Sequence, residues 1–394
     1  MPDISPVYMD YAATTPVADE VTTAMVACLT DPRAFANPSS SHAFGGAAQD
    51  VVDRAANHLS SALGAMPEEI VWTSGATESD NLAIIGAARY RANRGRHIIT
   101  SLVEHKAVID ACRQLEREGF EISWLSPGRD GQVTVAQVIS ALRDDTQLVS
   151  LMWVNNETGV INDIPALAAA MHEHPAMLHV DAAQAFGKLP IDLAAVPIDL
   201  LSVTAHKCYG PKGVGALYLA ARHGVQVEPL LFGGGQQRGL RPGTLAPHQI
   251  AGFGAAAALV EARLDDDMQS MASMGRRLEQ QLLSIDGVSL NANAADRLPS
   301  LINVSVAGVA GETLVAAMRP VALATGSACN SAVREPSFVL RALGLDDRLA
   351  AASLRFSIGR MTTADEVDLV ADRFRDAVDM ARRIAGELGQ VPPG

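Results

Sequence analysis

Seven short runs of mainly apolar residues divide the chain between residues 67 and 220. They lie at 70–72, 97–102, 122–125, 148–154, 177–180, 200–203 and 215–219. Apolar strands that alternate with helices predict an α/β fold built on a mostly parallel sheet, covered on both faces. Ligands of such sheets bind beyond the carboxyl ends of the strands. Polar residues that follow these runs are therefore the first candidates for a functional site.

Helical periodicity marks segments between and after the runs. A helix is predicted from about residue 78 to 93, where Gly95 ends it. The next helix repeats apolar residues at three- and four-residue spacing until Gly119 supplies a C-terminal stop. A glycine-rich loop at 233–243 precedes a long alanine-rich helix at about 246–285.

The last hundred residues have their own alternation of strands and helices. Strands are predicted at 300–306, 321–324 and 353–357, with helices closing the chain. We therefore expect two domains. The large one spans 16–260, and a smaller α+β domain combines 1–15 with 261–394.

Composition narrows the class of protein. The chain has 394 residues, of which 48% are hydrophobic and 19% charged, as is usual for a folded soluble protein of more than one domain. Its formal net charge of −13 argues against a nucleic-acid partner, because phosphate binding requires clustered Lys and Arg. No apolar stretch reaches the roughly 18 residues that would span a membrane, and the amino terminus does not resemble a signal peptide. We expect a cytoplasmic protein.

The four cysteines are widely spaced and form no Cys-x-x-Cys pair. A structural zinc site or a disulfide framework is therefore not expected. Cys28 and Cys112 fall on apolar helical patterns and are predicted to be core residues. Cys208 is also expected to pack, whereas Cys329 is considered below.

Lys207 offers the strongest chemical signal. It follows the predicted strand 200–203 in the run Ala205-His-Lys-Cys-Tyr-Gly-Pro-Lys-Gly213. A lysine at such a position can form a Schiff base with an aldehyde, because local desolvation favours the neutral, nucleophilic amine. The alternative is a surface lysine in a Gly/Pro turn.

Two further polar segments follow predicted strands. Thr73-Ser-Gly-Ala-Thr77 opens a helix and could gather backbone N–H groups around an anion, or could simply cap the helix through Ser74 or Thr77. His105 follows the run 97–102. It could be a satisfied histidine at a helix start, or could lie against an aromatic ligand and carry protons.

Asp181 ends the run 177–180, and Gln184 comes three residues later. A carboxylate at this point is often only a helix cap. It is also where a pyridinium nitrogen would need a negative partner to keep its proton. Asp181 and Lys207 end consecutive predicted strands, so both are expected at the ligand-binding edge.

These segments together resemble the cysteine desulfurases, which are pyridoxal 5′-phosphate (PLP) enzymes of the class V aminotransferase group. The matching motifs run in the same order from about Tyr8 to Met361. They include Tyr8-Met-Asp-Tyr-Ala-Ala-Thr-Thr15, Thr73-Ser-Gly-Ala-Thr-Glu78, Val154-Asn-Asn-Glu-Thr-Gly159, His179-Val-Asp-Ala-Ala-Gln184, Ala205-His-Lys207, Arg238-Gly-Leu-Arg-Pro-Gly-Thr244 and Gly326-Ser-Ala-Cys329. The resemblance implies a PLP-dependent transferase of fold type I, with a seven-stranded sheet in its large domain.

The resemblance also implies roles for individual residues. Lys207 would be joined to the PLP aldehyde, Asp181 would face the pyridine nitrogen and Gln184 would bond the phenolic oxygen. His105 would stack on the ring and take part in catalysis. The phosphate would be bound by Ala76, Thr77, Thr204, His206 and, in a homodimer, the partner subunit's Thr244. No metal is implied.

The substrate implied is L-cysteine, with its carboxylate held by Asn155 and Arg355. A guanidinium group suits that role, because it matches a carboxylate in a bidentate fork; outside this context Arg355 would be taken for a surface ion pair. Pro242 and Asn330 replace residues more usual in the family, and this leaves the sulfur acceptor open.

Cys329 decides the reaction. It lies among small residues from Thr325 to Ala332, which predict an accessible loop, and a free thiol is partly ionised near neutral pH. In the family the equivalent thiolate takes the sulfur of cysteine, leaving a persulfide and alanine. The segment 335–344 resembles the branch with a long cysteine loop, which can carry sulfur to an acceptor protein.

Two other functions stay open. A different aminotransferase or lyase of the same fold would not need Cys329, and the aminotransferase would require a keto acid. A non-catalytic sulfur-transfer scaffold would have lost the cofactor, against which the set Lys207, Asp181, His105 and Arg355 argues. For a desulfurase, the acceptor could serve iron–sulfur cluster assembly, tRNA thiolation or DNA phosphorothioation, and selenocysteine could also be a substrate.

Overall fold

The computed structural model describes residues 6–294, 296–325 and 336–389. Its larger sheet has seven strands, as the apolar runs predict. These are β1 (Ile70–Thr73), β2 (His97–Ser101), β3 (Glu121–Leu125), β4 (Thr146–Met152), β5 (Met177–Asp181), β6 (Leu200–Thr204) and β7 (Gly215–Leu219). Their order is β1-β7-β6-β5-β4-β2-β3. β7 runs antiparallel to both neighbours, and the other pairs are parallel.

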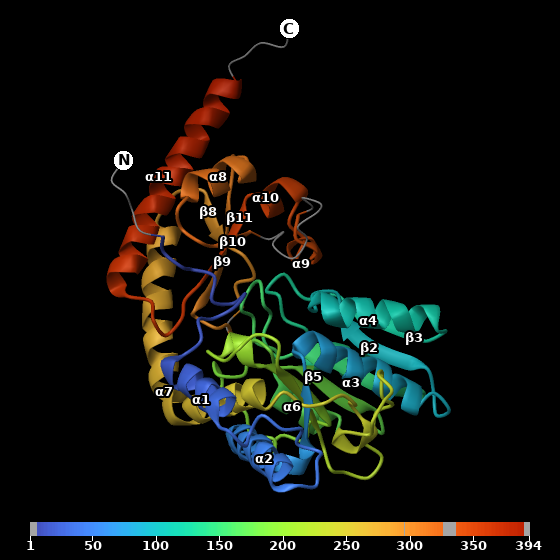
Figure 1. The fold of residues 1–394 in the computed structure, drawn as a ribbon. Coiled ribbons are helices and arrows are strands. Elements are labelled where there is room, and N and C mark those ends of the chain that lie inside the picture. The colour runs from blue at the N-terminus through green and yellow to red at the C-terminus, as the bar shows by residue number, and fades with distance from the viewer. Residues whose placement is uncertain (1–5, 295, 326–335, 390–394) are drawn as a thin grey trace.

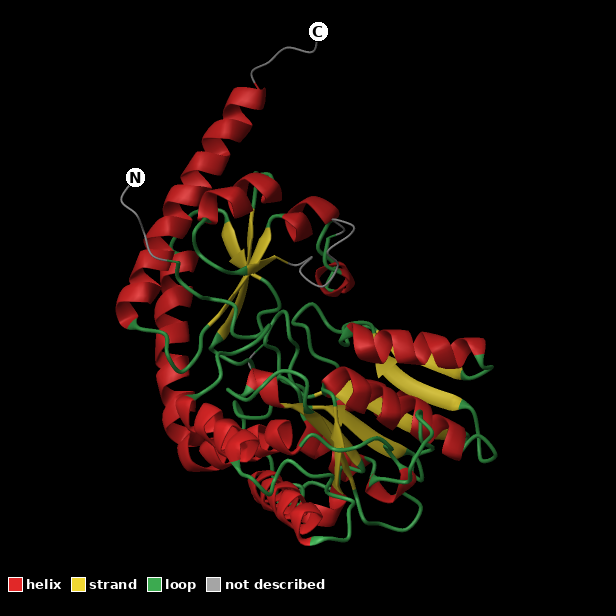
Figure 2. Cartoon of the chain, viewed as in Figure 1, coloured by secondary structure: helices red, strands yellow, loops and turns green. Residues whose placement is uncertain are grey.

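Helices pack around this sheet (Figure 2). α3 (Ala76–Tyr90) contacts β4, β5, β6 and β7 and lies beside α4 (Lys106–Arg117), while α1 (Asp19–Thr30) and α2 (Ala43–Leu63) pack on α7 (Pro247–Leu283). Two short helices, α5 (Val135–Ala141) and α6 (Ile164–Ala170), complete this part. The helix predicted at 78–93 therefore begins and ends two to three residues earlier, whereas the long alanine-rich helix is confirmed.

A second sheet of four antiparallel strands follows α7. It contains β8 (Val288–Leu290), β9 (Leu301–Val306), β10 (Ala324–Thr325) and β11 (Ser353–Ser357), in the order β10-β11-β9-β8. Its helices are α8 (Gly311–Met318), α9 (Phe338–Ala342), α10 (Asp347–Ala351) and α11 (Ala364–Gly389). The strand predicted at 321–324 is wrong in extent, because only Ala324 and Thr325 pair with β11.

Each sheet has its own apolar core, and two chain segments join them. α7 places Phe253 and Val260 in the first core and Leu278 and Leu282 in the second. Figure 1 shows α7 running along one side of both sheets. The amino-terminal segment also reaches both, with Met9 in the second core and Tyr11 in the first.

Four polar side chains are buried together in the second sheet. Asn291 donates to Asn303 Oδ1 at 2.7 Å and accepts from Ser305 Oγ at 2.8 Å. Ser305 also lies 2.7 Å from Ser353 Oγ, which donates to a backbone carbonyl at 2.8 Å. Because each member has a partner here, this group needs no ligand to satisfy it. We call these residues, Asn291, Asn303, Ser305 and Ser353, the paired cluster.

Within the described ranges, no helix combines the length and the apolar character needed to cross a membrane.

Candidate active site

The ends of β5 and β6 bring Asp181 and Lys207 to one edge of the sheet. Asp181 is the last residue of β5 and pairs in register with Ser202 of β6. A single 3-10 turn, Ala205–Lys207, follows β6 directly and carries Lys207. Asp181 is only 6% exposed, and its Oδ1 accepts from the Ala183 N–H at 2.9 Å. The helix cap expected as an alternative is wrong, because the described chain has no helix between β5 and β6; Asp181 caps a turn instead, through one carboxylate oxygen.

His105 stands at the start of α4, where its Nδ1 accepts from the Ala107 N–H at 3.2 Å. This hydrogen bond leaves Nε2 as the nitrogen that can carry a proton. Burial lowers the pKa of His105, and the positive charge of Lys207 lowers it further. The imidazole is therefore neutral at neutral pH. His105 both caps the start of α4 and lies close enough to Lys207 and Asp181 for their charges to shift its pKa.

An uncapped helix end faces the β6–β7 turn. The residue before α3 is Gly75, and no side chain caps this helix, so the expected capping by Ser74 or Thr77 is wrong. Instead Ser74 N–H donates to Glu78 Oε2 at 2.7 Å. Gly75 has φ 153°, a conformation almost restricted to glycine. The first N–H groups of α3, at Ala76 and Thr77, are thereby left for an anion.

Thr204 and His206 lie next to this helix end. Thr204 pairs with Gly215, and a Cβ on Gly215 would come within 2.6 Å of the Gly75 Cα. The turn between β1 and α3, which contains Gly75, is therefore in contact with the start of β7. His206 is fixed by the amino-terminal segment, since its Nδ1 lies 3.2 Å from Thr14 Oγ1. Burial and the charge of Lys207 lower the pKa of His206 to about 4, so it is a neutral donor or acceptor at neutral pH.

Gln184 is held from two sides. Its Nε2 donates to the Ala12 carbonyl at 2.7 Å, and its Oε1 accepts from Lys188 Nζ at 2.9 Å. Lys188 is 9% exposed and also lies 3.3 Å from the Gln184 carbonyl. Burial lowers the pKa of Lys188 to about 7, with a further contribution from the charge of Lys207. Sequence analysis missed Lys188, although its four-residue spacing from Gln184 is a visible signal.

Asn155 and Arg355 come together from different sheets. Arg355, on β11, donates from Nη1 to the Asn156 carbonyl and from Nη2 to Asp10 Oδ1, both at 2.7 Å. It is 7% exposed, so the surface ion pair considered as an alternative is wrong. Its Nε is buried without a partner among the described residues.

Asn155 is already engaged in its own loop. Its Oδ1 accepts from the N–H groups of Glu157 and Thr158, both at 2.9 Å. Its Nδ2 donates to the Val103 carbonyl at 3.0 Å and to Met152 Sδ at 3.3 Å. Because a thioether is a weak acceptor, the second hydrogen is the one that a substrate carboxylate could take.

Two further buried carboxyl groups lie near Asp181, and sequence analysis missed both. Asp80 of α3 has no hydrogen-bond partner among the described residues, and burial and the charge of Asp181 raise its pKa well above the usual range. Burial raises the pKa of Glu104 to about 8. His179 Nε2 lies 3.6 Å from Asp80 Oδ1, and burial lowers the pKa of His179 to about 4, so the imidazole is neutral at neutral pH.

Two predicted site residues are not brought to this edge by any described contact. Thr244 is exposed, in a loop that Arg241 ties to Glu78 at 2.8 Å. Cys329 lies outside the described residues. The other cysteines are buried, as expected, and burial raises the pKa of Cys208 to about 12.

The fold and this site have known counterparts. The family model for class V aminotransferases matches residues 7–370, and the chain belongs to this family. Its members are PLP-dependent enzymes with the fold of type I PLP transferases.

Among the relatives, the chain is similar to the cysteine desulfurases IscS. The protein of Azotobacter vinelandii is 49% identical over 96% of this chain and 94% of its own length, and that of Aeromonas salmonicida (strain A449) gives the same values. Solved structures are also similar. A NifS-like protein superposes with a TM-score of 0.87 at 32% identity, covering 95% of this chain and 100% of its own. SspA in complex with cysteine gives 0.81 at 37%, covering 91% and 100%, and DndA from Streptomyces lividans gives 0.76 at 41%, covering 89% and 99%.

The described residues fit PLP. The uncapped start of α3 offers N–H groups to a phosphate, and its glycine can only be replaced with strain. The buried carboxyl group of Asp181 at this edge suits a protonated ring nitrogen. Lys207 at the same edge offers the amine. The donor set therefore matches each polar part of the cofactor.

Proposed function

We propose that this protein is a cysteine desulfurase. L-Cysteine and the thiol of Cys329 give L-alanine and a persulfide on Cys329. The carbon–sulfur bond of the substrate breaks, a sulfur–sulfur bond forms, and the substrate Cβ takes a proton. The persulfide sulfur then passes to an acceptor protein. The convergence of Lys207, Asp181 and His105 at one sheet edge, in a chain of this family, carries the proposal.

Each of these residues would hold a different part of the cofactor. Lys207 would hold it covalently, Asp181 would keep its ring nitrogen protonated, and Gln184 would bond its phenolic oxygen. Bound PLP supplies an electron sink next to the substrate Cα. The phosphate would be held by Ala76, Thr77, Thr204, His206 and the partner subunit's Thr244.

His105 would orient the ring and move protons. With Nδ1 committed to capping α4, a proton can be held or released only at Nε2. Its lowered pKa keeps this nitrogen from adding a positive charge beside Lys207. A neutral histidine in this position can accept a proton that an amine releases.

Arg355 and Asn155 would bind the substrate carboxylate. Arg355 keeps its buried Nε–H and one hydrogen on each terminal nitrogen beyond its present contacts. Asp10 holds the guanidinium in place, so a carboxylate would meet a positioned group rather than a flexible one. This preorganisation reduces the entropic cost of binding.

The active unit would be a homodimer. The loop that carries Thr244 exposes Leu231 and, at 88% exposure, Phe232, and isolated large apolar side chains on a glycine-rich loop are suited to packing against a partner subunit. Light scattering that gives a dimer mass would support this arrangement. A monomer that retains full cofactor binding would contradict it.

The division into domains stays a proposal as well. Residues 16–260 would form the cofactor domain, and 1–15 with 261–394 the domain that carries the Cys329 segment. The two separate apolar cores support it, while α7 contributes to both. A cytoplasmic location and the identity of the acceptor also stay predictions, with iron–sulfur assembly, tRNA thiolation and DNA phosphorothioation as the candidates.

The test is direct. Purified protein should be yellow, should form alanine from L-cysteine without a keto acid, and should show 32 Da added to the Cys329 peptide. Cys329→Ser should bind the cofactor normally and form no persulfide. Undiminished turnover in Cys329→Ser, or a requirement for a keto acid, would instead support another enzyme of the same family.

A further inference from the structure

A pocket of about 270 Å³ lies at the opposite edge of the large sheet from Lys207. It is lined by the first residues of β5, Met177 and Leu178, and by Asp199, which precedes β6. Since β5 has five residues, its two ends lie about 13 Å apart. The pocket is thus separate from the site of Asp181.

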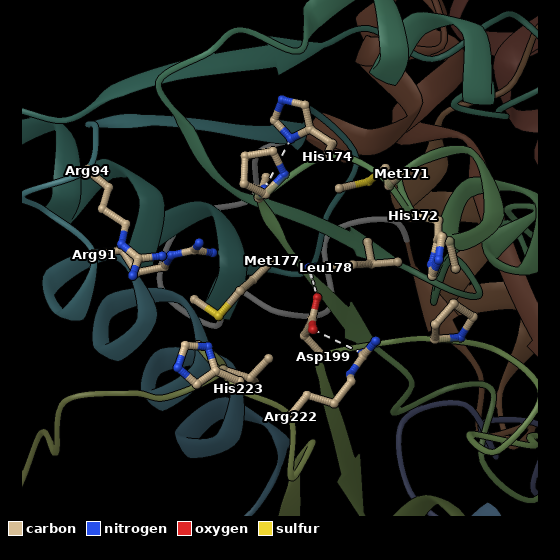
Figure 3. Close-up of a pocket in the computed structure, with 16 residues that line it drawn as sticks. Arg91, Arg94, Met171, His172, His174, Met177, Leu178, Asp199, Arg222 and His223 are labelled. Atoms are coloured by element: carbon tan, nitrogen blue, oxygen red, sulfur yellow. Dashed lines mark hydrogen bonds and ion pairs between the residues drawn. The ribbon is translucent and has the colours of Figure 1, made fainter.

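The lining of the pocket is basic. Figure 3 draws Arg91 and Arg94 on one side and the Asp199–Arg222 pair on the other. Histidines 172, 174 and 223 complete its polar lining. Three arginines against a single carboxylate give a net positive site in a protein whose formal net charge is −13.

Among the described residues, the Nε of Arg91 lacks the acceptor that a buried donor requires. Arg91 is 5% exposed, and its Nε is buried with no hydrogen bond to any described residue. Asp199 is near but is already used, since Oδ2 accepts from the Leu178 N–H at 2.8 Å and Oδ1 pairs with Arg222 at 3.0 Å. A buried guanidinium nitrogen without an acceptor is costly, and an anion in the pocket would lower that cost.

We propose that this pocket binds a phosphate-type dianion, either inorganic phosphate or the phosphate of a small phosphomonoester. The guanidinium of Arg91 would bind its oxygens at the base, and Arg94 would bind at the rim. Planar guanidinium groups pair with phosphate oxygens in a bidentate manner, and histidines add donors when protonated.

The holoenzyme is the material for the test, because its cofactor phosphate site is already filled. Inorganic phosphate and ribose 5-phosphate are titrated separately by calorimetry at constant ionic strength, with chloride as the reference. Wild type should bind at least one of the two saturably at one site. Arg91→Gln should weaken binding about tenfold or more, and the exposed Arg94→Gln about threefold.

Arg89→Gln is the matched control. It removes the same charge from the last turn of α3, two residues before Arg91, but Arg89 pairs with Glu118 at 2.7 Å and does not line the pocket. Binding that Arg89→Gln and Arg94→Gln weaken equally is non-specific and overturns the site. The absence of saturable binding of both phosphates to wild type overturns it as well. Tight binding of the phosphomonoester alone assigns the ligand to that source.

A different observation concerns the amide of Gln184. A protonated lysine only donates hydrogen bonds and a backbone carbonyl only accepts them. Lys188 on one side and the Ala12 carbonyl on the other therefore fix the amide with Oε1 toward Lys188. One Nε2 hydrogen remains after the bond to Ala12.

We infer that Lys188 is a positioning residue that keeps this remaining N–H directed at the phenolic oxygen of the cofactor. The inference rests on the proposed function, which places Gln184 at that oxygen. Without Lys188, the Ala12 carbonyl alone among the described contacts would hold the amide, and a turned amide would present a lone pair to a negatively charged oxygen. Loss of Lys188 should change the visible absorption of the bound cofactor as well as the rate, because a hydrogen-bond donor favours the ionised phenolic oxygen.

The pH at which the visible absorption of the bound cofactor changes is the measurement. Lys188→Met should move it upward by about one pH unit, a tenfold change in proton affinity. Lys188→Gln can still donate to Gln184 Oε1 and should move it by less than half as much. Gln184→Met should equal Lys188→Met, and the double variant should add nothing further. Lys212→Met, which removes an exposed lysine, is the control.

The outcomes distinguish failure of the proposed function from failure of the role of Lys188. Wild-type protein without visible absorption overturns the proposed function and this inference together. A normal wild-type titration that is unchanged in Lys188→Met overturns only the role of Lys188. Additive shifts in the double variant would also contradict it, because they would mean that Lys188 acts independently of Gln184.

Discussion

The buried polar residues of the second sheet bond one another, whereas two carboxyl groups behind Lys207 keep oxygens without a partner among the described residues. In the paired cluster, Ser305 bonds both Asn291 and Ser353 at distances of 2.8 and 2.7 Å. At the edge of the first sheet, neither oxygen of Asp80 has a hydrogen-bond partner among the described residues, and the pKa of Glu104 is raised to about 8. Both groups are equally removed from water, so burial alone does not distinguish them. The comparison indicates that buried polar atoms without hydrogen-bond partners mark the site, whereas buried polar residues that bond one another do not.

Removing Lys207 should have the largest effect. Lys207→Ala should lower alanine formation more than about a thousandfold, equivalent to roughly 4 kcal/mol, because the covalent link to the cofactor is lost. The visible absorption of the lysine-bound cofactor should also disappear. Folding should be unaffected, as measured by urea denaturation. Activity within tenfold of wild type would remove Lys207 from the mechanism.

Glu104 tests how much a buried carboxyl group with an unpartnered oxygen lowers the free energy of unfolding. Its folded pKa of about 8 lies above the ordinary value of 4.5, so its contribution to stability is present at low pH and is lost as the pH rises toward 8. Glu104→Gln should remove this loss. The free energy of unfolding of Glu104→Gln should match wild type near pH 4 and exceed it by about 4 kcal/mol at pH 8. A difference that does not change with pH would show that Glu104 is not held neutral.

Arg355 lies where the two regions meet, since it belongs to β11 but contacts Asp10 and Asn156. Arg355→Lys keeps the charge and loses the planar fork. We expect KM for L-cysteine to rise about tenfold to thirtyfold, near 2 kcal/mol, with a smaller change in kcat. A pure loss of kcat at unchanged KM would place Arg355 outside carboxylate binding.

The paired cluster should respond in the opposite way from Glu104. Ser305→Ala leaves Asn291 Oδ1 without its donor, and should cost about 1 kcal/mol of unfolding free energy at every pH between 5 and 8. Alanine formation at 25 °C should not change. A loss of activity without a loss of stability would mean that this cluster is coupled to the site.

Sequence patterns predicted the large sheet well, because fully buried strands are apolar throughout and short. They also placed Asp181 and Lys207 at one edge, since the ends of consecutive parallel strands meet there. The strand at 321–324 was misplaced because its apolar run also contributes Val321 to the second core outside the sheet. An apolar run records burial, and only the backbone pairing of Ala324 with Arg355 shows where the strand begins.

The same patterns could not predict which polar side chains the fold buries, or which of them it leaves without a hydrogen-bond partner. Asp80 lies in the polar first turns of α3, and nothing in its local sequence shows that the fold buries it beside Asp181. Lys188 and Arg91 look like ordinary surface cations until the fold buries them. The capping of α3 was also wrong, because Ser74 and Thr77 are good capping residues by type, whereas the close approach of Gly215 favours Gly75 at that position.

The most direct test is to find which lysine carries the cofactor. The chain has only four lysines, at positions 106, 188, 207 and 212, so borohydride reduction of the holoenzyme followed by peptide mass spectrometry gives an unambiguous answer. A pyridoxyl group on Lys207 alone is the predicted result. A pyridoxyl group on Lys106, Lys188 or Lys212, or on none of the four, would contradict the account.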